Sequence, residues 1–370
     1  MIENLIMFPE EGGNLIGFLI WPIFILVMML YGQRFQGFLA LNEIGRSLNK
    51  LKITRDKSKL EVIEFVKETI NPKEDPTDKI NQFLEYFTIM PVNLDPAGIV
   101  NKIEHIMNLR DHRMKEEIKS LSPNSNKVEL STVDNVIEIG SALNFIYKIV
   151  RHFYLFGKRT KSFFIIIQLQ MIMPLIMQQV DALNKALITF KQIQPIGDGI
   201  GPMIVGKLMM NKKTQEIAED TLLTEYKYND RKIYLMKAEG PGGNVGQPGL
   251  AVENIVKKMN VKLKNIIMID AALKLEGEKT GSIAEGIGAA IGGIGVDRFK
   301  IEEVAQKNNI PVYAIVIKQS LVEAISIMKK DIAESTDKVI EITQKIINEK
   351  SEKGDNILVI GVGNTIGVAQ

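Results

Sequence analysis

Residues 266–272, Ile-Ile-Met-Ile-Asp-Ala-Ala, form an apolar run that carries a single carboxylate, Asp270. A short apolar run without polar alternation is typical of a strand buried on both faces of a parallel sheet. Three further runs have this character, at 232–236, 312–317 and 357–360. Helical patterns separate the runs, at 203–210, 249–259, 301–308 and 321–350, the last of which we expect to be broken. The alternation predicts a doubly wound α/β domain over residues 187–370.

A second lone aspartate, Asp198, lies in the glycine-rich stretch 195–202, Pro-Ile-Gly-Asp-Gly-Ile-Gly-Pro, which opens the first of these helices. Open α/β sheets carry their chemistry just beyond the carboxyl ends of the strands. Two close carboxylates cannot both ionise cheaply, so one stays protonated as an acid while the other acts as a base. Asp198 and Asp270 are therefore our candidate catalytic pair, sharing one water. The alternative is that each aspartate only caps a helix or forms a turn.

Residues 239–249, Glu-Gly-Pro-Gly-Gly-Asn-Val-Gly-Gln-Pro-Gly, follow a predicted strand and open a helix. Glycines let backbone N–H groups approach a ligand closely, and a helix N-terminus favours negative charge. We expect Gly242, Gly243 and Asn244 to position a substrate backbone here. The segment is not a P-loop, because no Lys-Ser/Thr pair follows, and a purely structural loop is the alternative.

Three further features belong to the predicted site. Residues 280–295 are rich in glycine and could form a lid or a tight wall beside Asp270, or else a close-packed helix. Asn364, in the strand-end sequence Gly-Val-Gly-Asn at 361–364, is expected to orient a carboxylate, with a plain turn as the alternative. Lys318 ends another strand and is a candidate cation for an anionic intermediate, with a solvated strand end as the alternative.

An uncharged apolar segment near the N-terminus, residues 15–31, is about long enough to span a membrane as a helix. No Lys or Arg precedes it, whereas basic residues follow it at Arg34, Arg46, Lys50, Lys52 and Arg55. We therefore predict a single-pass anchor at 1–36 in the cell membrane, with a cytoplasmic C-terminal domain. A buried core helix and a cleaved signal peptide are the rivals, although the basic start and small-residue cleavage site of a signal peptide are missing.

Residues 37–186 are predicted to form a mostly helical domain. Its segment 162–180 is apolar but contains Gln168, Gln170 and Pro174, and a basic stretch precedes it. We favour a buried helix that packs the helical domain on the α/β domain. The alternatives are a helix in the membrane interface, with its basic flank on anionic lipid, and a second membrane span.

Composition excludes several classes of function. The net charge is +2, so no whole-protein field favours nucleic acid, and we expect no nucleic-acid partner. The chain has no cysteine, which excludes disulfides, thiolate catalysis and cysteine metal sites. All three histidines precede residue 160, so no Ser-His-Asp triad can form within the C-terminal half. We predict no metal site, and the cofactor and the oligomeric state stay open.

Five stretches of the C-terminal half, taken in order, resemble the germination protease family and its relatives, the hydrogenase-maturation endopeptidases. They are the helix start at 197–202, the loop at 241–249, the strand end at 269–271, the glycine-rich segment at 281–296 and the strand at 310–315. The resemblance covers residues 187–370 and rests on order and spacing, because no single motif is specific. It implies a phosphorylase/hydrolase-like α/β fold and puts the family's two acidic active-site positions on Asp198 and Asp270.

This chain departs from those families in several ways. Their Gly-x-Gly-Asn strand directly precedes the Asp-Gly helix, whereas here Gly-Val-Gly-Asn lies at 361–364. The difference implies a circular permutation, which is feasible because domain termini often lie close together. The nickel-binding histidine of the hydrogenase-maturation enzymes has no counterpart, and neither do the anchor and the helical region. The whole chain also resembles a functionally unassigned family of archaeal membrane-anchored proteins.

The sequence thus predicts a membrane-anchored cytoplasmic peptidase or related hydrolase that uses paired aspartates on a protein or peptide substrate. One alternative is a membrane-tethered scaffold or sensor without activity, whose glycine-rich pocket binds a small anion or a peptide tail. Another is a nucleosidase- or phosphorylase-like enzyme that acts on a phosphorylated small molecule. The fold alone does not choose among these functions.

Overall fold

The computed structural model describes residues 15–89, 91, 98–293 and 295–369, apart from the side chains of 15–19 and 27–31. The chain divides into two compact units, which we describe separately. Unit 1 comprises Met1–Ile53 and Phe145–Met177, and unit 2 comprises Thr54–Asn144 and Gln178–Gln370.

Unit 1 is built from parts of three helices. These are the first part of α1 (Leu15–Ile70), the second part of α4 (Lys127–Thr160) and the first part of α5 (Phe163–Lys191). Two glycines of α1 let the helices approach closely, since Gly37 lies against Phe163 and Gly45 against the hydroxyl of Tyr154. The buried side chains of the unit are Ala40, Ile44, Leu51, Val150, Ile166, Leu169 and Met173.

The helix α1 begins at Leu15, where the sequence predicts the start of the anchor, and continues without a break through Pro22 to Ile70. The described apolar side chains of 20–26 are 55–67% exposed. Part of the predicted anchor lies outside the described structure, namely residues 1–14 and the side chains of 15–19 and 27–31, so the anchor stays a prediction.

For α5, the expectation of a buried helix is wrong in the described structure. It is long and apolar enough to cross a membrane, and only 22% of its most apolar window is buried. The part of α5 at Phe163–Met177 belongs to unit 1 and not to the unit that contains the sheet. Apolar residues occur on the buried face and on the exposed face of this helix alike, so the sequence pattern does not separate a core helix from one with an exposed apolar face.

Unit 2 contains a seven-stranded mixed sheet in the order β1-β2-β3-β7-β4-β6-β5. The strands are β1 Gln215–Ala218, β2 Thr221–Tyr228, β3 Arg231–Ala238, β4 Leu263–Leu273, β5 Ile283–Ile287, β6 Val312–Gln319 and β7 Asn356–Gly361. The four strands expected from apolar runs are β3, β4, β6 and β7, and they are parallel neighbours. The antiparallel strands β1, β2 and β5 were not expected and lie at the two edges.

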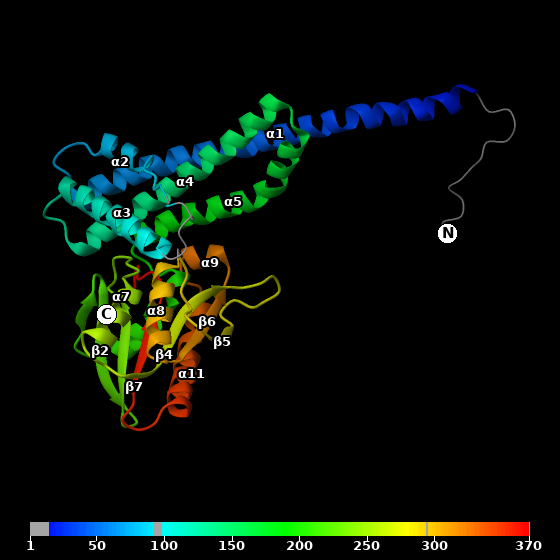
Figure 1. Cartoon of the computed structure of the whole chain (residues 1–370). Helices are drawn as coiled ribbons and strands as arrows, with labels where there is room; N and C mark the ends of the chain where they lie inside the picture. Colours follow the sequence, from blue (N-terminus) through cyan, green and yellow to red (C-terminus); the bar gives the residue numbers. More distant parts are fainter. Residues whose placement is uncertain (1–14, 90, 92–97, 294, 370) are drawn as a thin grey trace. The chain divides into compact units, whose positions relative to one another are not determined.

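The last strand of the chain, β7, lies between β3 and β4 and is drawn in red in Figure 1. Its residues Ile357 to Ile360 are at most 1% exposed. A strand this deep is buried on both faces, which explains its unbroken apolar sequence. The central position is the one expected for the first strand of a permuted domain.

Helices cover both faces of this sheet. One face packs on α6 (Ile200–Met209) and α11 (Ser335–Lys350), and the other packs on α7 (Pro248–Lys257) and α8 (Val296–Lys307). Successive side chains of β4 point to opposite faces of the sheet. Ile267 and Ile269 pack in the core with α6 and α11, while Ile266 and Met268 pack in the core with α7 and α8. The predicted helix at 321–350 is broken, as expected, into α9 (Leu321–Ile325), α10 (Lys330–Ala333) and α11.

The remaining helices of unit 2 come from the N-terminal half. They are α2 (Thr77–Phe83), α3 (Ile99–Leu121), and the parts of α1, α4 and α5 that lie outside unit 1. The chain is therefore a helical N-terminal region followed by a mixed α/β domain.

Close backbone contact fixes α6 on the sheet at Gly201. A Cβ at this position would lie 2.3 Å from the carbonyl oxygen of Val362 and 2.4 Å from that of Ile269. Both atoms belong to the backbone at the ends of central strands, so they cannot yield without distorting the sheet. Only glycine fits here.

We expect Gly201→Ala to lower the free energy of unfolding by about 3 kcal/mol or more, because the added methyl group forces α6 off the sheet. The control is Gly206→Ala on the same helix, where the new Cβ would meet the flexible Lys237 Cε at 3.3 Å. Alanine's helix propensity offsets that contact by about 1 kcal/mol, so the control should be nearly neutral. Thermal unfolding of the full-length variants measures both, and equal melting temperatures would contradict the expectation.

Candidate functional site

The candidate site lies where α6 begins, beyond the carboxyl ends of the central strands. Asp198 sits in a short 3₁₀ turn, η1 (Gly197–Gly199), directly before α6. The turn interlocks with the segment after β7, since a Cβ on Gly363 would lie 2.0 Å from the carbonyl oxygen of Asp198. Gly363 also has a φ of +134°, which only glycine adopts readily. The two glycine-rich sequences thus hold each other in place.

The Asp198 carboxylate accepts a hydrogen bond from the backbone N–H of Asn364 at 2.8 Å. The side-chain amide of Asn364 in turn donates to the carbonyl of Gly243 at 3.2 Å, while its oxygen accepts from the N–H of Ile366 at 2.9 Å. The N-cap positions of η1 and α6 are Ile196 and Gly199, so Asp198 occupies neither of them. Three residues singled out from sequence, Asp198, Asn364 and Gly243, therefore meet at one point.

The carboxyl of Asp270 lies near the end of β4 and is only 7% exposed. Burial and, to a smaller extent, the negative charge of Asp198 raise its pKa to about 8. Hydrogen bonds from the backbone of Ala271, at 2.7 Å, and of Gly292 oppose this rise. Burial also raises the pKa of Asp198, against the hydrogen bond from Asn364. Burial thus raises the pKa of both carboxyls, and the negative charge of Asp198 contributes to the rise at Asp270.

The glycine loop before α7 is held by α4. Ser131 Oγ donates to the carbonyl of Gly242 at 2.6 Å, and Asn135 Nδ2 donates to that of Gly243 at 3.0 Å. Both glycines are buried. Sequence reasoning missed Ser131 and Asn135, which lie more than 100 positions from their partners and belong to no motif. The carbonyl groups of the loop are therefore engaged by the protein itself.

Asn244 is also held within the protein. Its backbone N–H donates to Thr365 Oγ1 at 3.0 Å, and its side chain donates to the carbonyl of Glu239 at 3.0 Å. Thr365 Oγ1 donates in turn to the same Glu239 carbonyl at 2.7 Å. These bonds join the loop to the segment after β7. Substrate binding by Gly242, Gly243 and Asn244 stays a prediction.

The predicted cation Lys318 forms an ion pair with Glu278. In the sheet it aligns with Ala272, two residues beyond Asp270. Among the described residues, the hydrogen bond and ion pair of the Lys318 side chain are made with Glu278 and not with Asp198 or Asp270, so the structure does not bring this lysine to the pair. Its role toward an anionic intermediate stays a prediction.

The glycine-rich segment 280–295 is not the helix that one interpretation predicts. Its first part forms the edge strand β5, and the backbone of Gly292 then hydrogen-bonds to Asp270. A Cβ on Gly292, Gly293 or Gly295 would meet nothing within 4 Å. The described part of this segment therefore borders Asp270, and its role as a lid or a tight wall stays a prediction.

Two buried polar side chains near these strand ends carry no sequence signal. Lys237, at the end of β3, is 1% exposed, and burial lowers its pKa to about 8 while its Nζ donates to the carbonyl of Ala238 at 3.0 Å. Gln319, at the end of β6, is 1% exposed, and neither of its amide atoms has a hydrogen-bond partner among the described residues. A Cβ on Gly197 would lie 2.3 Å from the Oε1 of Gln319. Both residues lie at the ends of largely apolar strands, so no sequence motif singles them out.

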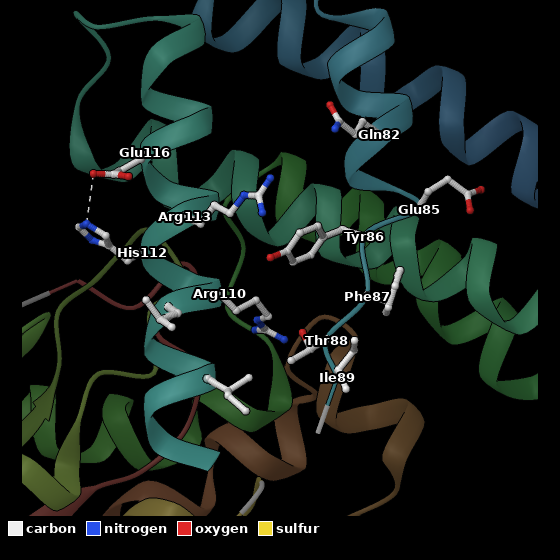
Figure 2. Close-up of a pocket in the computed structure, with 12 residues that line it drawn as sticks. Gln82, Glu85, Tyr86, Phe87, Thr88, Ile89, Arg110, His112, Arg113 and Glu116 are labelled. Atoms are coloured by element: carbon white, nitrogen blue, oxygen red, sulfur yellow. Dashed lines mark ion pairs between the residues drawn. The ribbon is translucent and has the colours of Figure 1, made fainter. Parts of the chain in front are cut away.

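An open groove of about 780 Å³ lies elsewhere in unit 2, between α3 and the segment that follows α2 (Figure 2). Its cations are engaged: Arg110 pairs with Glu138 at 3.1 Å, and Arg113 pairs with Glu117 at 2.7 Å. Arg113 also lies 5.4 Å from the ring centre of Tyr86. Because its charges are already paired, the groove offers less chemistry than the aspartate pair. Over the described ranges, no group of three His, Asp or Glu side chains could hold a metal ion.

Two family models match the chain. Residues 18–193 match the N-terminal domain of a protein of unknown function (DUF1512), and residues 196–369 match the C-terminal DUF1512 domain. The chain therefore belongs to the DUF1512 family. Neither a curated protein nor a solved structure matches it, so the likeness to germination protease still rests on the order of the motifs.

Proposed function

We propose that this DUF1512-family chain is a membrane-associated hydrolase in which Asp198 and Asp270 activate one water. The observation that carries the proposal is the placement of two buried carboxyls beyond the central strands: Asp270 is 7% exposed near the end of β4, and Asp198 is held by the Asn364 N–H before α6. Burial and the charge of Asp198 together raise the pKa of Asp270 to about 8. A shared proton between two carboxyls is the arrangement that separates an acid from a base. A carboxyl kept protonated by burial is costly, and such groups cluster at functional sites.

In the proposed reaction, Asp198 takes a proton from the water while the oxygen of that water attacks the carbonyl carbon of the substrate. Asp270 gives its proton to the leaving group as the bond to the carbonyl carbon breaks. The proton held by Asp198 then returns to Asp270 through solvent, which restores the pair. Asn364 orients Asp198, because its backbone N–H holds one carboxylate oxygen at 2.8 Å.

A peptide substrate is favoured by the resemblance to germination protease, whose motifs recur here in permuted order. The central place of β7 supports that permutation, because the strand before the Asp-Gly helix is central in such a sheet. The exposed apolar segment at 20–26 supports attachment to a membrane, with unit 2 in the cytoplasm. A phosphorylase/hydrolase-like fold is part of the same proposal.

One observation favours a second candidate, a scaffold or sensor without activity. The carbonyls of Gly242 and Gly243 are occupied by Ser131 and Asn135, so the glycine loop already serves to join α4 to the sheet domain. In this case the aspartates contribute to a site that binds an anion or a peptide tail without cleaving it.

The pH dependence of cleavage tests the lead proposal. Full-length protein is incubated with a mixed peptide library, and new peptide termini are counted by mass spectrometry. We expect the rate to fall above about pH 8, tenfold for each further pH unit, because Asp270 loses its proton there. At low pH the rate should fall again as Asp198 becomes protonated.

A rate that keeps rising above pH 9 would exclude Asp270 as the proton donor. Absence of new termini at every pH, from protein whose thermal unfolding is cooperative, would favour the scaffold. The control is Asp230→Asn in an exposed turn, where Asp230 pairs with Lys353 at 2.9 Å and should not affect cleavage.

A further inference from the structure

The helix α5 is apolar on two opposite faces. One face packs inside unit 1 through Ile166, Leu169 and Met173. Another presents Phe164, Met171 and Leu175, which are 69%, 75% and 66% exposed. A surface helix of a soluble protein is polar opposite its core. The second face of α5 therefore needs an apolar covering.

The other helices of unit 1 have exposed apolar stripes too. On α4, Phe145, Ile149 and Phe153 recur every four residues and are 41–64% exposed. On α1 the exposed group is Phe35, Phe38 and Leu39. Exposed apolar surface on all three helices is far beyond the scattered apolar residues of a soluble surface and marks an interaction site. The same α1 helix carries the exposed segment 20–26.

The charge of this part of the chain identifies the partner. Residues 145–177 contain no acidic residue, and their basic residues are all exposed: Lys148, Arg151, Lys158, Arg159 and Lys161. Clusters of basic residues beside apolar helix faces are attracted to anionic lipid headgroups. A second protein surface would need matching acids as well as apolar area, whereas an anionic leaflet supplies both.

The depth of contact follows from the hairpin turn. Lys158, Arg159 and Lys161 lie at the turn between α4 and α5, so a hairpin that crossed the bilayer would carry three cations through it. A helix that lies in the interface keeps these cations at the lipid headgroups and avoids that cost.

We propose that the α4–α5 hairpin of unit 1 lies in the headgroup region of an anionic membrane leaflet, as a membrane contact additional to the predicted N-terminal anchor. Phe164, Met171 and Leu175 enter the acyl boundary, while the cations of the turn meet lipid phosphates. The contact is independent of the aspartate pair and of any catalytic activity.

The absence of cysteine makes a direct test practical, because one introduced thiol is labelled without background. Met171→Cys and Leu175→Cys carry an environment-sensitive fluorophore in full-length protein, one copy per nanodisc of phosphatidylcholine and phosphatidylglycerol. Lipids with a nitroxide quencher at a shallow or a deep acyl position report the depth. The control label is Lys345→Cys on α11, whose side chain is 69% exposed in unit 2.

We expect severalfold quenching at 171 and 175, stronger from the shallow than from the deep nitroxide, and none at 345. Stronger deep quenching would mean a membrane span and overturn the in-plane contact. No quenching at 171 and 175 would mean that protein, including a second copy of this chain, covers the face, which also overturns it.

Charge is tested in the same labelled background. Lys158→Gln, Arg159→Gln and Lys161→Gln together, or neutral lipid alone, should reduce quenching at 171 severalfold. A matched triple change at Lys330, Lys345 and Lys353 of unit 2, made without the control label, should leave it unchanged. Equal quenching in anionic and neutral lipid would overturn the electrostatic part of the contact.

Discussion

Deletion of residues 355–370 is expected to unfold the α/β domain, although it removes only the end of the chain. The deletion takes out β7, which pairs with β3 on one side and β4 on the other. The four apolar residues from Ile357 to Ile360 are at most 1% exposed, and burial of such side chains contributes about 2 kcal/mol each. Their sum is comparable with the whole stability of a typical domain, about 5–15 kcal/mol.

Circular dichroism and limited proteolysis of the truncated chain measure the effect. Point variants in the full chain provide a graded version: Leu358→Ala in β7 should cost about 2–5 kcal/mol. Ile287→Ala is the matched control in edge strand β5, where the side chain is 89% exposed and the cost should stay within about 0.5 kcal/mol. A truncated protein with an unchanged melting temperature would show that this segment is a dispensable tail.

Burial on both faces explains which strands the sequence predicts. The middle of a strand such as β4 is buried on both faces and is therefore apolar from Ile266 to Ile269, and such an unbroken apolar run is easy to recognise. The edge strand β5 is largely exposed, so glycine and glutamate are tolerated there and no pattern marks it. The hairpin of β2 and β3 does have a sequence signal, the turn-forming pair Asn229-Asp230. Both residues have positive φ, as a tight two-residue turn requires.

The candidate site likewise contains residues that the sequence predicts and residues that it does not. The meeting of Asp198 with Asn364 follows from glycine-rich motifs at strand ends, where the topology of an open sheet brings them together. Ser131 and Asn135 come from an ordinary stretch of α4, and only tertiary packing brings them to the loop. Sequence also cannot separate Gly201, which is surrounded by backbone, from Gly292, which lies in open space.

The same reasoning applies to α5. Its composition shows that it is apolar, but a buried face and a face against lipid are built from the same residue types. Only the packing of Met173 inside unit 1, with Met171 left exposed, separates the two faces. The preference for a buried helix failed for this reason.

Asp198→Asn and Asp270→Asn are each expected to abolish cleavage, because each removes one half of an acid–base unit while preserving size. The double variant should be no worse than either single one, since residues that act as a unit are not additive. Asn364 can still donate its N–H to the new amide oxygen at 198. The rate on an identified peptide is the measurement, with Asp230→Asn as the control at an exposed turn.

Stability separates this mechanism from a structural role for the same residues. The folded-state pKa of Asp270, about 8, lies above its unfolded value of about 4, so the folded protein binds this proton more tightly. Its contribution to stability is therefore complete below pH 4 and is lost as the pH rises through 8. Asp270→Asn escapes that loss, so its melting temperature should exceed that of the wild type at pH 8 and match it at pH 4. A gain in stability with a loss of activity is typical of a residue kept for function. If Asp270→Asn instead melts lower than the wild type at both pH values, and no cleavage is found in the parent, the carboxyl serves the fold and the scaffold is the better account.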